Sequence, residues 1–183
     1  MKRLTSSLLA VFFAALLLAG AAADGVTFQT AYFTMTLPEG WQTDTEAEKD
    51  AQEGTDSLGS FAEPEDIGLV AGAWLMYYDE LKNVSLWEYD EAELDDYAQE
   101  LMESFAEDNP EYLGIVMAEN VPFVVFRGTD EDGEYLYADT MTNGYAIVFT
   151  AFVSDMEGEK QYPISDEDTD QFLSILETFR PVT

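Results

Sequence analysis

The sequence contains no cysteine and no histidine among its 183 residues. The lack of cysteine excludes disulfides, thiol nucleophiles, thiolate metal sites and a lipid-anchoring cysteine behind an export signal. The lack of histidine excludes Ser-His-Asp and Cys-His catalysis and removes the usual zinc and iron ligands. Two large groups of enzymes and most transition-metal sites are therefore ruled out by composition alone.

Basic residues are scarce as well. The chain has 7 lysines and arginines against 38 aspartates and glutamates, a formal net charge of −31. Such a surface repels phosphate backbones and anionic lipids, so we expect no binding to nucleic acid or to a membrane surface. A chain of this charge would be disordered if it were poor in aromatic residues. Aromatics make up 14% of it, however, which predicts an ordered and very acidic domain.

The first 23 residues have the pattern of an export signal. Two basic residues, the second of them Arg3, precede the apolar run 8–19, and small residues then offer a cleavage site after Ala23. The alternative is an uncleaved membrane anchor, because no charge lies between Arg3 and Asp24 and about 20 residues can cross a bilayer. Both readings place the remaining chain outside the cytoplasm. We therefore predict a secreted or extracytoplasmic protein without a further membrane span.

Residues 24–183 are expected to form a single domain. The stretch 112–153 contains four apolar, β-branched and aromatic runs that are separated by short polar turns. Its last turn is Asn143-Gly144, the strongest short hairpin signal, because a type I′ turn needs positive φ at both central residues. The stretch therefore predicts an antiparallel meander of four strands.

Both faces of these strands are apolar. In residues 145–153 one face carries Ile147 and Phe149 and the other carries Val148 and Phe152. Strands of an antiparallel sheet with one solvent-exposed face alternate between apolar and polar residues. Strands of a sheet that is covered on both faces are apolar throughout. The pattern predicts a layer on each side of the sheet.

Two segments have the periodicity of helices that would form these layers. Residues 90–108 begin with Asp90 and Glu93 in capping-box positions and carry an apolar stripe. Residues 166–179 follow Ser165 as N-cap, and their acidic first turn suits the helix dipole. We therefore predict an α+β fold, an α/β/α sandwich in which helices cover both faces of an antiparallel sheet of about six strands.

The segments before the first helix complete the predicted sheet. Residues 26–37 alternate as one strand, and residues 38–41 form a turn that brings Trp41 back onto the sheet. Residues 42–57 are polar and acidic and predict a surface loop, and 58–62 predict a short edge strand. Residues 67–78 predict a long strand, with a buried helix as the alternative.

The order of these elements resembles that of the PsbP-like group of small α/β/α domains. The resemblance rests on an aromatic-rich strand that runs into LP-x-GW (FTMTLPEGW, 33–41), on a helix that ends near LMESF (101–105), and on a last helix that ends LETFRP (176–181). It covers most of residues 24–183 and implies a non-enzymatic binding or accessory protein. The acidic loop and the extreme charge depart from the group's usual pattern, so no ligand site is carried over.

No catalytic or metal-binding constellation stands out. Glycoside hydrolysis needs two facing carboxyls, but 38 acidic residues guarantee pairs at any spacing. Asp166, Asp168 and Asp170 imitate a calcium loop, but Gln171 stands where that loop needs glycine. We predict no cofactor and no dedicated metal site. The alternatives to a binding domain are a carboxylate-based glycosidase or cell-wall hydrolase and an acidic protein that binds calcium weakly.

The aromatic residues outnumber what one small core can hold. Tyrosine and tryptophan suit interfaces because they bring contact area with few rotamers and a polar tip. Trp87, Tyr89, Tyr135 and Tyr137 lie beside predicted turns, and we predict that they form an interaction surface for a protein or cell-envelope partner. The alternative is that they pack beneath the helices.

The export signal makes a direct prediction about the mature protein. If the signal is cleaved, intact-mass or N-terminal analysis of the secreted protein will show a chain that starts at Asp24, within a few residues. Full-length protein recovered only from membranes would instead establish the uncleaved anchor.

Overall fold

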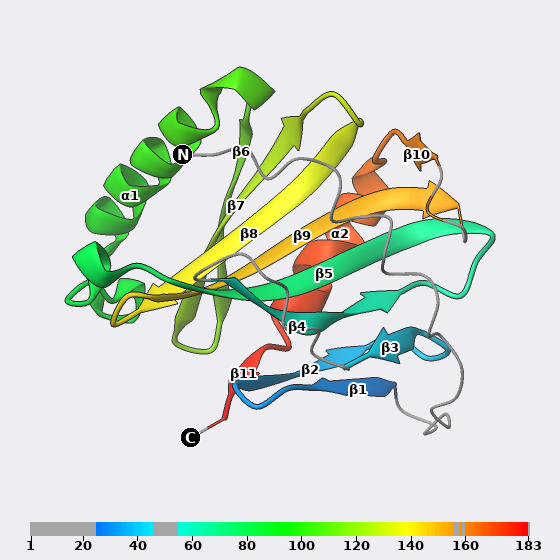
Figure 1. Ribbon diagram of the computed structural model, residues 1–183, viewed down its shortest axis with the longest axis horizontal. Helices are drawn as coiled ribbons and strands as arrows, with labels where there is room; N and C mark the ends of the chain where they lie inside the picture. Colours follow the sequence, from blue (N-terminus) through cyan, green and yellow to red (C-terminus); the bar gives the residue numbers. More distant parts are fainter. Residues whose placement is uncertain (1–24, 46–54, 156–157, 159, 183) are drawn as a thin grey trace.

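The computed structural model describes residues 25–45, 55–155, 158 and 160–182, and an eight-stranded antiparallel sheet dominates this part of the chain (Figure 1). Its path runs β3-β4-β5-β9-β8-β7-β6, with β10 paired to the end of β9. The strands are β3 (Gln42–Asp44), β4 (Thr55–Ala62), β5 (Ile67–Tyr77), β6 (Glu111–Ala118), β7 (Val121–Thr129), β8 (Glu134–Thr142), β9 (Tyr145–Asp155) and β10 (Gln161–Tyr162). The fold class is α+β, as predicted, but the large sheet has eight strands where about six were predicted.

The predicted meander is present as β6 to β9. Asn143 and Gly144 have φ of 51° and 77° in the turn between β8 and β9, which confirms the Asn-Gly hairpin. In the loop between β7 and β8 the Asp130 carboxylate accepts hydrogen bonds from the backbone N–H of Asp132 and Gly133 at 2.8 and 3.1 Å. The turn residues therefore set the register that the apolar runs require.

The longest ladder joins β5 to β9. It runs without a break from Ile67 paired with Asp155 to Tyr77 paired with Tyr145, and it confirms 67–78 as a strand. Gly72 leaves room for the Trp74 ring, which lies 2.3 Å from the position where a Cβ would stand. A side chain at position 72 would displace this ring.

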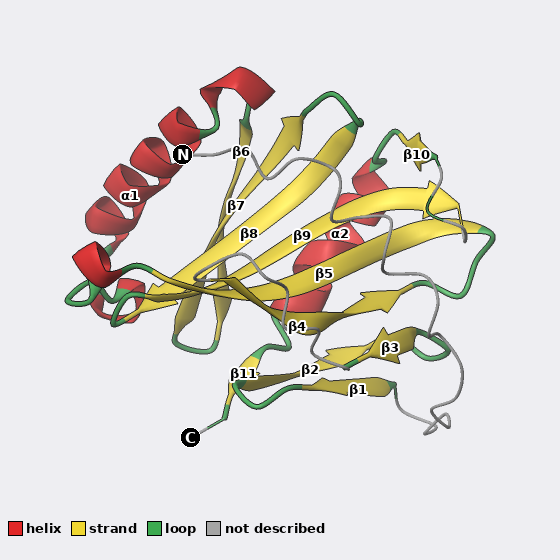
Figure 2. Cartoon of the chain, viewed as in Figure 1, coloured by secondary structure: helices red, strands yellow, loops and turns green. Residues whose placement is uncertain are grey.

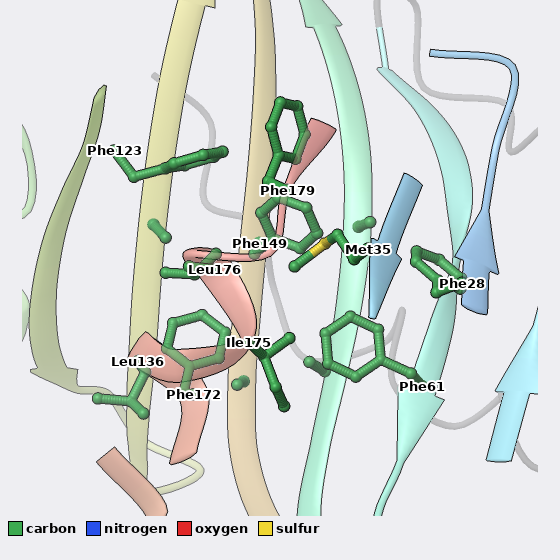
Figure 3. Packing of buried hydrophobic residues seen from close by; sticks show 14 of the residues in the cluster. Phe28, Met35, Phe61, Phe123, Leu136, Phe149, Phe172, Ile175, Leu176 and Phe179 are labelled. Carbon is green, nitrogen blue, oxygen red and sulfur yellow. The ribbon is translucent and has the colours of Figure 1, made fainter. Parts of the chain in front are cut away.

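One face of the sheet is covered by α2 (Asp166–Leu176) together with a second, small sheet (Figure 2). That sheet has the order β1-β2-β11, from β1 (Val26–Gln29), β2 (Phe33–Leu37) and β11 (Arg180–Pro181). Figure 3 shows how phenylalanines and aliphatic side chains from both sheets and from α2 interlock in this layer. The Phe149 ring lies within 5.4 to 6.5 Å of the rings of Phe33, Phe61, Phe123 and Phe179.

The opposite face is covered by α1 (Glu91–Ser104) over the β6–β9 half of the sheet. Asp90 caps the helix and Glu93 completes the capping box, as predicted. Leu94 and Ala98 are buried, and a 3-10 turn at Ala106–Asp108 then leads to Asn109, which has φ of 49°. The acidic residues of α1 lie on its exposed side, which is the amphipathic arrangement that the spacing predicted.

Three sequence predictions about the first third of the chain are wrong. Residues 26–37 form a hairpin of two strands, because Thr30 bends the chain: its Oγ1 accepts from the N–H of Phe33 at 3.1 Å. The predicted loop 42–57 begins with β3 and ends in β4, and its residues 46–54 lie outside the described part. Residues 58–62 belong to an eight-residue strand between β3 and β5 and are not an edge.

The export prediction concerns residues 1–23, which lie outside the described residues. Neither described helix has both the length and the apolar character that a bilayer crossing requires.

Phe149 provides a test of the layer that α2 and the small sheet form. It is fully buried, so we expect Phe149→Ala to lower the free energy of unfolding by about 3–5 kcal/mol, because four neighbouring rings would border the cavity. Chemical denaturation measures this loss. Ile67→Ala, at an apolar residue that is 44% exposed at the start of β5, is the control. Equal effects of the two changes would contradict the layer assignment.

Candidate functional site

Two of the four aromatics predicted as an interaction surface are core residues. Tyr135 and Tyr137 are 9% and 8% exposed, so their prediction as surface residues is wrong. The Tyr137 ring stacks on Phe126 at 4.8 Å, and the Tyr135 hydroxyl donates to the Asp108 carboxylate at 2.7 Å. They are buried because α1 and the 3-10 turn that follows it cover this part of β8. Asp108, the last residue of that turn, accepts the hydrogen bond of the Tyr135 hydroxyl.

Trp87 and Tyr89 are half-buried beside the end of β8. Pairing between β7 and β8 stops at Val124 with Asp139, and a 3-10 turn at Leu86–Glu88 lies against both strands there. The Trp87 indole N–H donates to Thr140 Oγ1 at 3.0 Å. This contact fixes the indole at the end of the sheet, with part of the ring in solvent.

An exposed tyrosine pair lies at the same end of the sheet. Tyr77 ends β5, Tyr145 begins β9, and the two residues are direct cross-strand partners. Their ring centroids are 4.8 Å apart, and the residues are 44% and 49% exposed. The sequence contains both tyrosines, but only the register of β5 against β9 brings them together.

Tyr77 and Tyr145 lie on one face of the sheet, and Trp87, which packs against the clusters on both faces, reaches that face through Thr140. Thr140, which holds Trp87, pairs with Ile147, and Ile147 lies two residues from Tyr145 along β9. Alternation along each strand places Thr140, Ile147, Tyr145 and Tyr77 on the α2 side. We call Trp87, Tyr77 and Tyr145 the aromatic surface. It has a polar rim, since the Tyr77 hydroxyl donates to Asp79 at 3.4 Å.

A buried carboxyl lies under α1, and the sequence analysis missed it. Asp139 is 2% exposed and lies on the α1 side of β8. One of its oxygens accepts a short hydrogen bond from the Tyr97 hydroxyl of α1, and Oδ1 has no hydrogen-bond partner in the described part of the chain. Asp139 therefore ties the helix to the sheet through a single hydroxyl.

Burial changes the proton affinity of this pair. Loss of solvent raises the pKa of Asp139 from 3.8 to about 6, although the Tyr97 hydrogen bond opposes the shift. Burial, and then the nearby Asp139 charge, raise the pKa of Tyr97 well above its usual value. The described basic side chains make their contacts elsewhere: Lys82 with Asp79, Arg127 with Thr169, Lys160 with Tyr162 and Arg180 with Glu119. None of these four described cations therefore pairs with the buried carboxylate.

A shallow depression of about 430 Å³ lies between β2 and α2. Leu37, Pro38, Gln171 and Ile175 contribute to its lining, and Glu39 is the single carboxyl among its described lining residues. Hydrolysis of a glycosidic bond needs a second carboxyl facing the first. This depression therefore lacks the pair that such a reaction requires.

The acidic residues do not gather into a metal site within the described ranges. No group of three or more carboxylates there is close enough to hold an ion. The segment that imitates a calcium loop is the start of α2, where Ser165 and Asp168 form a capping box. Helix capping therefore accounts for the position of Asp168.

Comparisons with known proteins give little that bears on function. No family model matches the chain, and no curated protein matches it. A crystal structure from Bacteroides thetaiotaomicron VPI-5482, at 1.50 Å resolution, is similar with a TM-score of 0.40 and 13% identity. The match covers 87% of this chain and 49% of the other, so the chain spans about half the length of that protein.

Asp139 generates a prediction about pH. Its pKa is higher in the folded than in the unfolded state, so its contribution to stability is complete below about pH 4 and declines as pH rises to about 6. The difference between a pKa of 3.8 and one of about 6 corresponds to roughly 3 kcal/mol. We expect the free energy of unfolding of Asp139→Asn to fall less between pH 4 and pH 7 than that of the wild type, as measured by urea denaturation.

Asp96→Asn is the control for this experiment, because it removes one charge from the exposed face of α1. It separates the effect of the buried carboxyl from the general repulsion in a chain of formal charge −31. If the curve of Asp139→Asn ran parallel to that of the wild type, Asp139 would not be the titrating group.

Proposed function

We propose that this chain is an exported, PsbP-like, non-enzymatic binding domain that holds a protein or cell-envelope partner through the aromatic surface. The observation that carries this proposal is the exposed pair of Tyr77 and Tyr145, whose rings lie 4.8 Å apart on adjacent strands. Aromatic side chains bring contact area with few rotamers to lose, which suits them to act as binding anchors.

The position of the pair favours binding. Both tyrosines terminate the β5–β9 ladder, the longest in the sheet, so their backbones are held on rigid elements. Leu75 and Ile147 lie next to them on the same face and are 7% and 8% exposed. The rings are thus backed by core residues, while their outer surfaces remain open to a partner.

The surroundings of the rings match the anatomy of an interface. A charged pair, Lys82 and Asp79 at 3.8 Å, lies in the segment that follows Tyr77, and Asn143 is exposed at the adjacent hairpin. Interfaces combine an apolar centre with a polar, solvent-accessible rim. A partner that covered Tyr77 and Tyr145 would meet such a rim around them.

The PsbP-like assignment is part of the proposal, and local features support it. Trp41 of the LP-x-GW motif is 5% exposed and packs against Phe61 with ring centroids 5.9 Å apart. Its backbone N–H donates to the Pro38 carbonyl at 3.4 Å. The motif therefore acts as a turn that anchors a tryptophan in the core, which is the structural role that the resemblance implies.

The test is a binding comparison between two double variants of the exported protein. The probes are purified cell-wall polysaccharide and solubilised envelope protein from the source organism. Loss of both rings in Tyr77→Ala/Tyr145→Ala is expected to weaken capture of one probe by at least about tenfold, since truncation of an interface anchor costs about 1–2 kcal/mol or more. Tyr77→Phe/Tyr145→Phe keeps the rings and should retain most of the binding.

Ile67→Ala is the matched control, because Ile67 is 44% exposed at the opposite end of the strand that Tyr77 ends. Melting temperatures check that each variant is folded. Equal capture by the wild type and Tyr77→Ala/Tyr145→Ala would contradict the aromatic surface as the binding site. Turnover of the wall polysaccharide by the wild type would contradict the non-enzymatic assignment.

A further inference from the structure

Strand β6 (Glu111–Ala118) is an open edge of the large sheet. It pairs with β7 on one side, and no described strand pairs with it on the other. The other end of the sheet is β3, which has only three residues. β6 has eight, so it is the longer of the two edges that the described strands leave open. An edge strand presents unpaired N–H and C=O groups that can receive another strand.

The hairpin geometry identifies which backbone groups face outward. Ala118 pairs with Val121 across a two-residue turn, and such a pair exchanges both of its hydrogen bonds. Alternation then turns the N–H and C=O of Met117 and Ile115 away from β7. These two residues offer two donors and two acceptors to an incoming strand.

Proline at position 122 agrees with this assignment. Pro122 pairs with Met117, so its nitrogen points away from β6, toward the side where β8 would lie. The β7–β8 pairing does not reach that far and stops at Val124. A proline, which has no N–H, therefore fits at position 122 without the loss of a ladder bond.

The edge carries few of the features that normally block strand addition. Charged side chains, above all lysine, together with prolines and bulges protect natural edges. β6 has a bulge between Tyr112 and Gly114 at its start, but the run from Ile115 to Ala118 contains no charge and no proline. Met117 is 50% exposed, so this half of the edge is accessible.

Charge identifies the kind of occupant that fits. Glu111 is exposed at the start of β6, and Glu119, which follows its end, is exposed but pairs with Arg180 at 2.9 Å. Burial, and then the charge of Asp95 on α1, raise the pKa of the nearby Tyr112, so a further carboxylate lies close to the edge. A second copy of the chain would bring its own formal charge of −31 to this edge, and like charges oppose such pairing. A segment rich in lysine and arginine would be attracted instead.

From these observations we propose that β6 captures an extended, basic segment of another protein as an additional strand of the sheet. Backbone bonds to Ile115 and Met117 would supply the affinity, as in other cases of strand addition. Lysine or arginine side chains would meet the acidic residues around the edge, and alternate apolar side chains would lie beside Met117 or Val116. This site is separate from the aromatic surface and does not depend on the function proposed above.

The test uses an octapeptide of alternating lysine and valine with blocked ends, titrated into the full protein. Met117→Pro removes an outward N–H while leaving the β6–β7 bonds in place, and Met117→Ala removes the side chain while keeping that N–H. We expect Met117→Pro to weaken peptide binding at least about tenfold relative to Met117→Ala. An octapeptide of alternating lysine and proline, which has the same charge but cannot pair as a strand, sets the electrostatic baseline.

Hydrogen exchange in the unaltered protein gives a second readout that needs no variant. Bound lysine-valine peptide should slow exchange of the Ile115 and Met117 amides and leave that of Val116 and Ala118, which already bond β7, nearly unchanged. Equal binding of the two peptides, equal binding by Met117→Pro and Met117→Ala, or protection confined to other strands would overturn the proposal. So would a homodimer in sedimentation analysis that Met117→Pro abolishes, since the edge would then belong to a second copy.

Discussion

The structure depends on a central sheet that is apolar on both faces. In β9, Phe149 on one side and Val148 on the other are both almost completely buried. Burial of a large apolar side chain contributes about 1.5–3 kcal/mol, so neither face is stable without a covering layer. The hairpins assemble this sheet. The capped helices and the small sheet form the two layers that cover it.

The two layers differ in chemistry. The α2 side is a packing of phenylalanines and aliphatic side chains, in which Phe28, Phe33, Phe149 and Phe179 are fully buried. The α1 side combines aliphatic side chains with Phe126 and several tyrosines. It also contains Asp139, whose only hydrogen bond from a described residue comes from Tyr97. A buried carboxyl without a cation opposes folding when it is ionised. We therefore expect ionisation of Asp139 to weaken the contact between α1 and the sheet as pH rises.

The elements with a local signal could be predicted, and those set by long-range pairing could not. The Asn143-Gly144 turn, both capping boxes and the long strand that became β5 follow from adjacent residues. The hairpin within residues 26–37 was hidden, because alternation continues on both sides of the Thr30 turn. Tyr135 and Tyr137 share a face by their spacing, but which face α1 covers depends on packing across the sheet. Asp139 could have been recognised in the sequence. It is the one charged residue in the strand segment YLYADTM (135–141), and alternation places it on the same face as Tyr135 and Tyr137.

The most direct test of this account is native-state hydrogen exchange on the free protein at low concentration. A sheet that is covered on both faces and has an open edge at β6 should show its slowest amides along β5 and β9, and these should exchange only through global unfolding. The amides of Ile115 and Met117 should exchange orders of magnitude faster than those of β9. Protection at Ile115 and Met117 equal to that of β9 would mean that the edge is already occupied. Fast exchange throughout β9 would mean that the two layers do not enclose it.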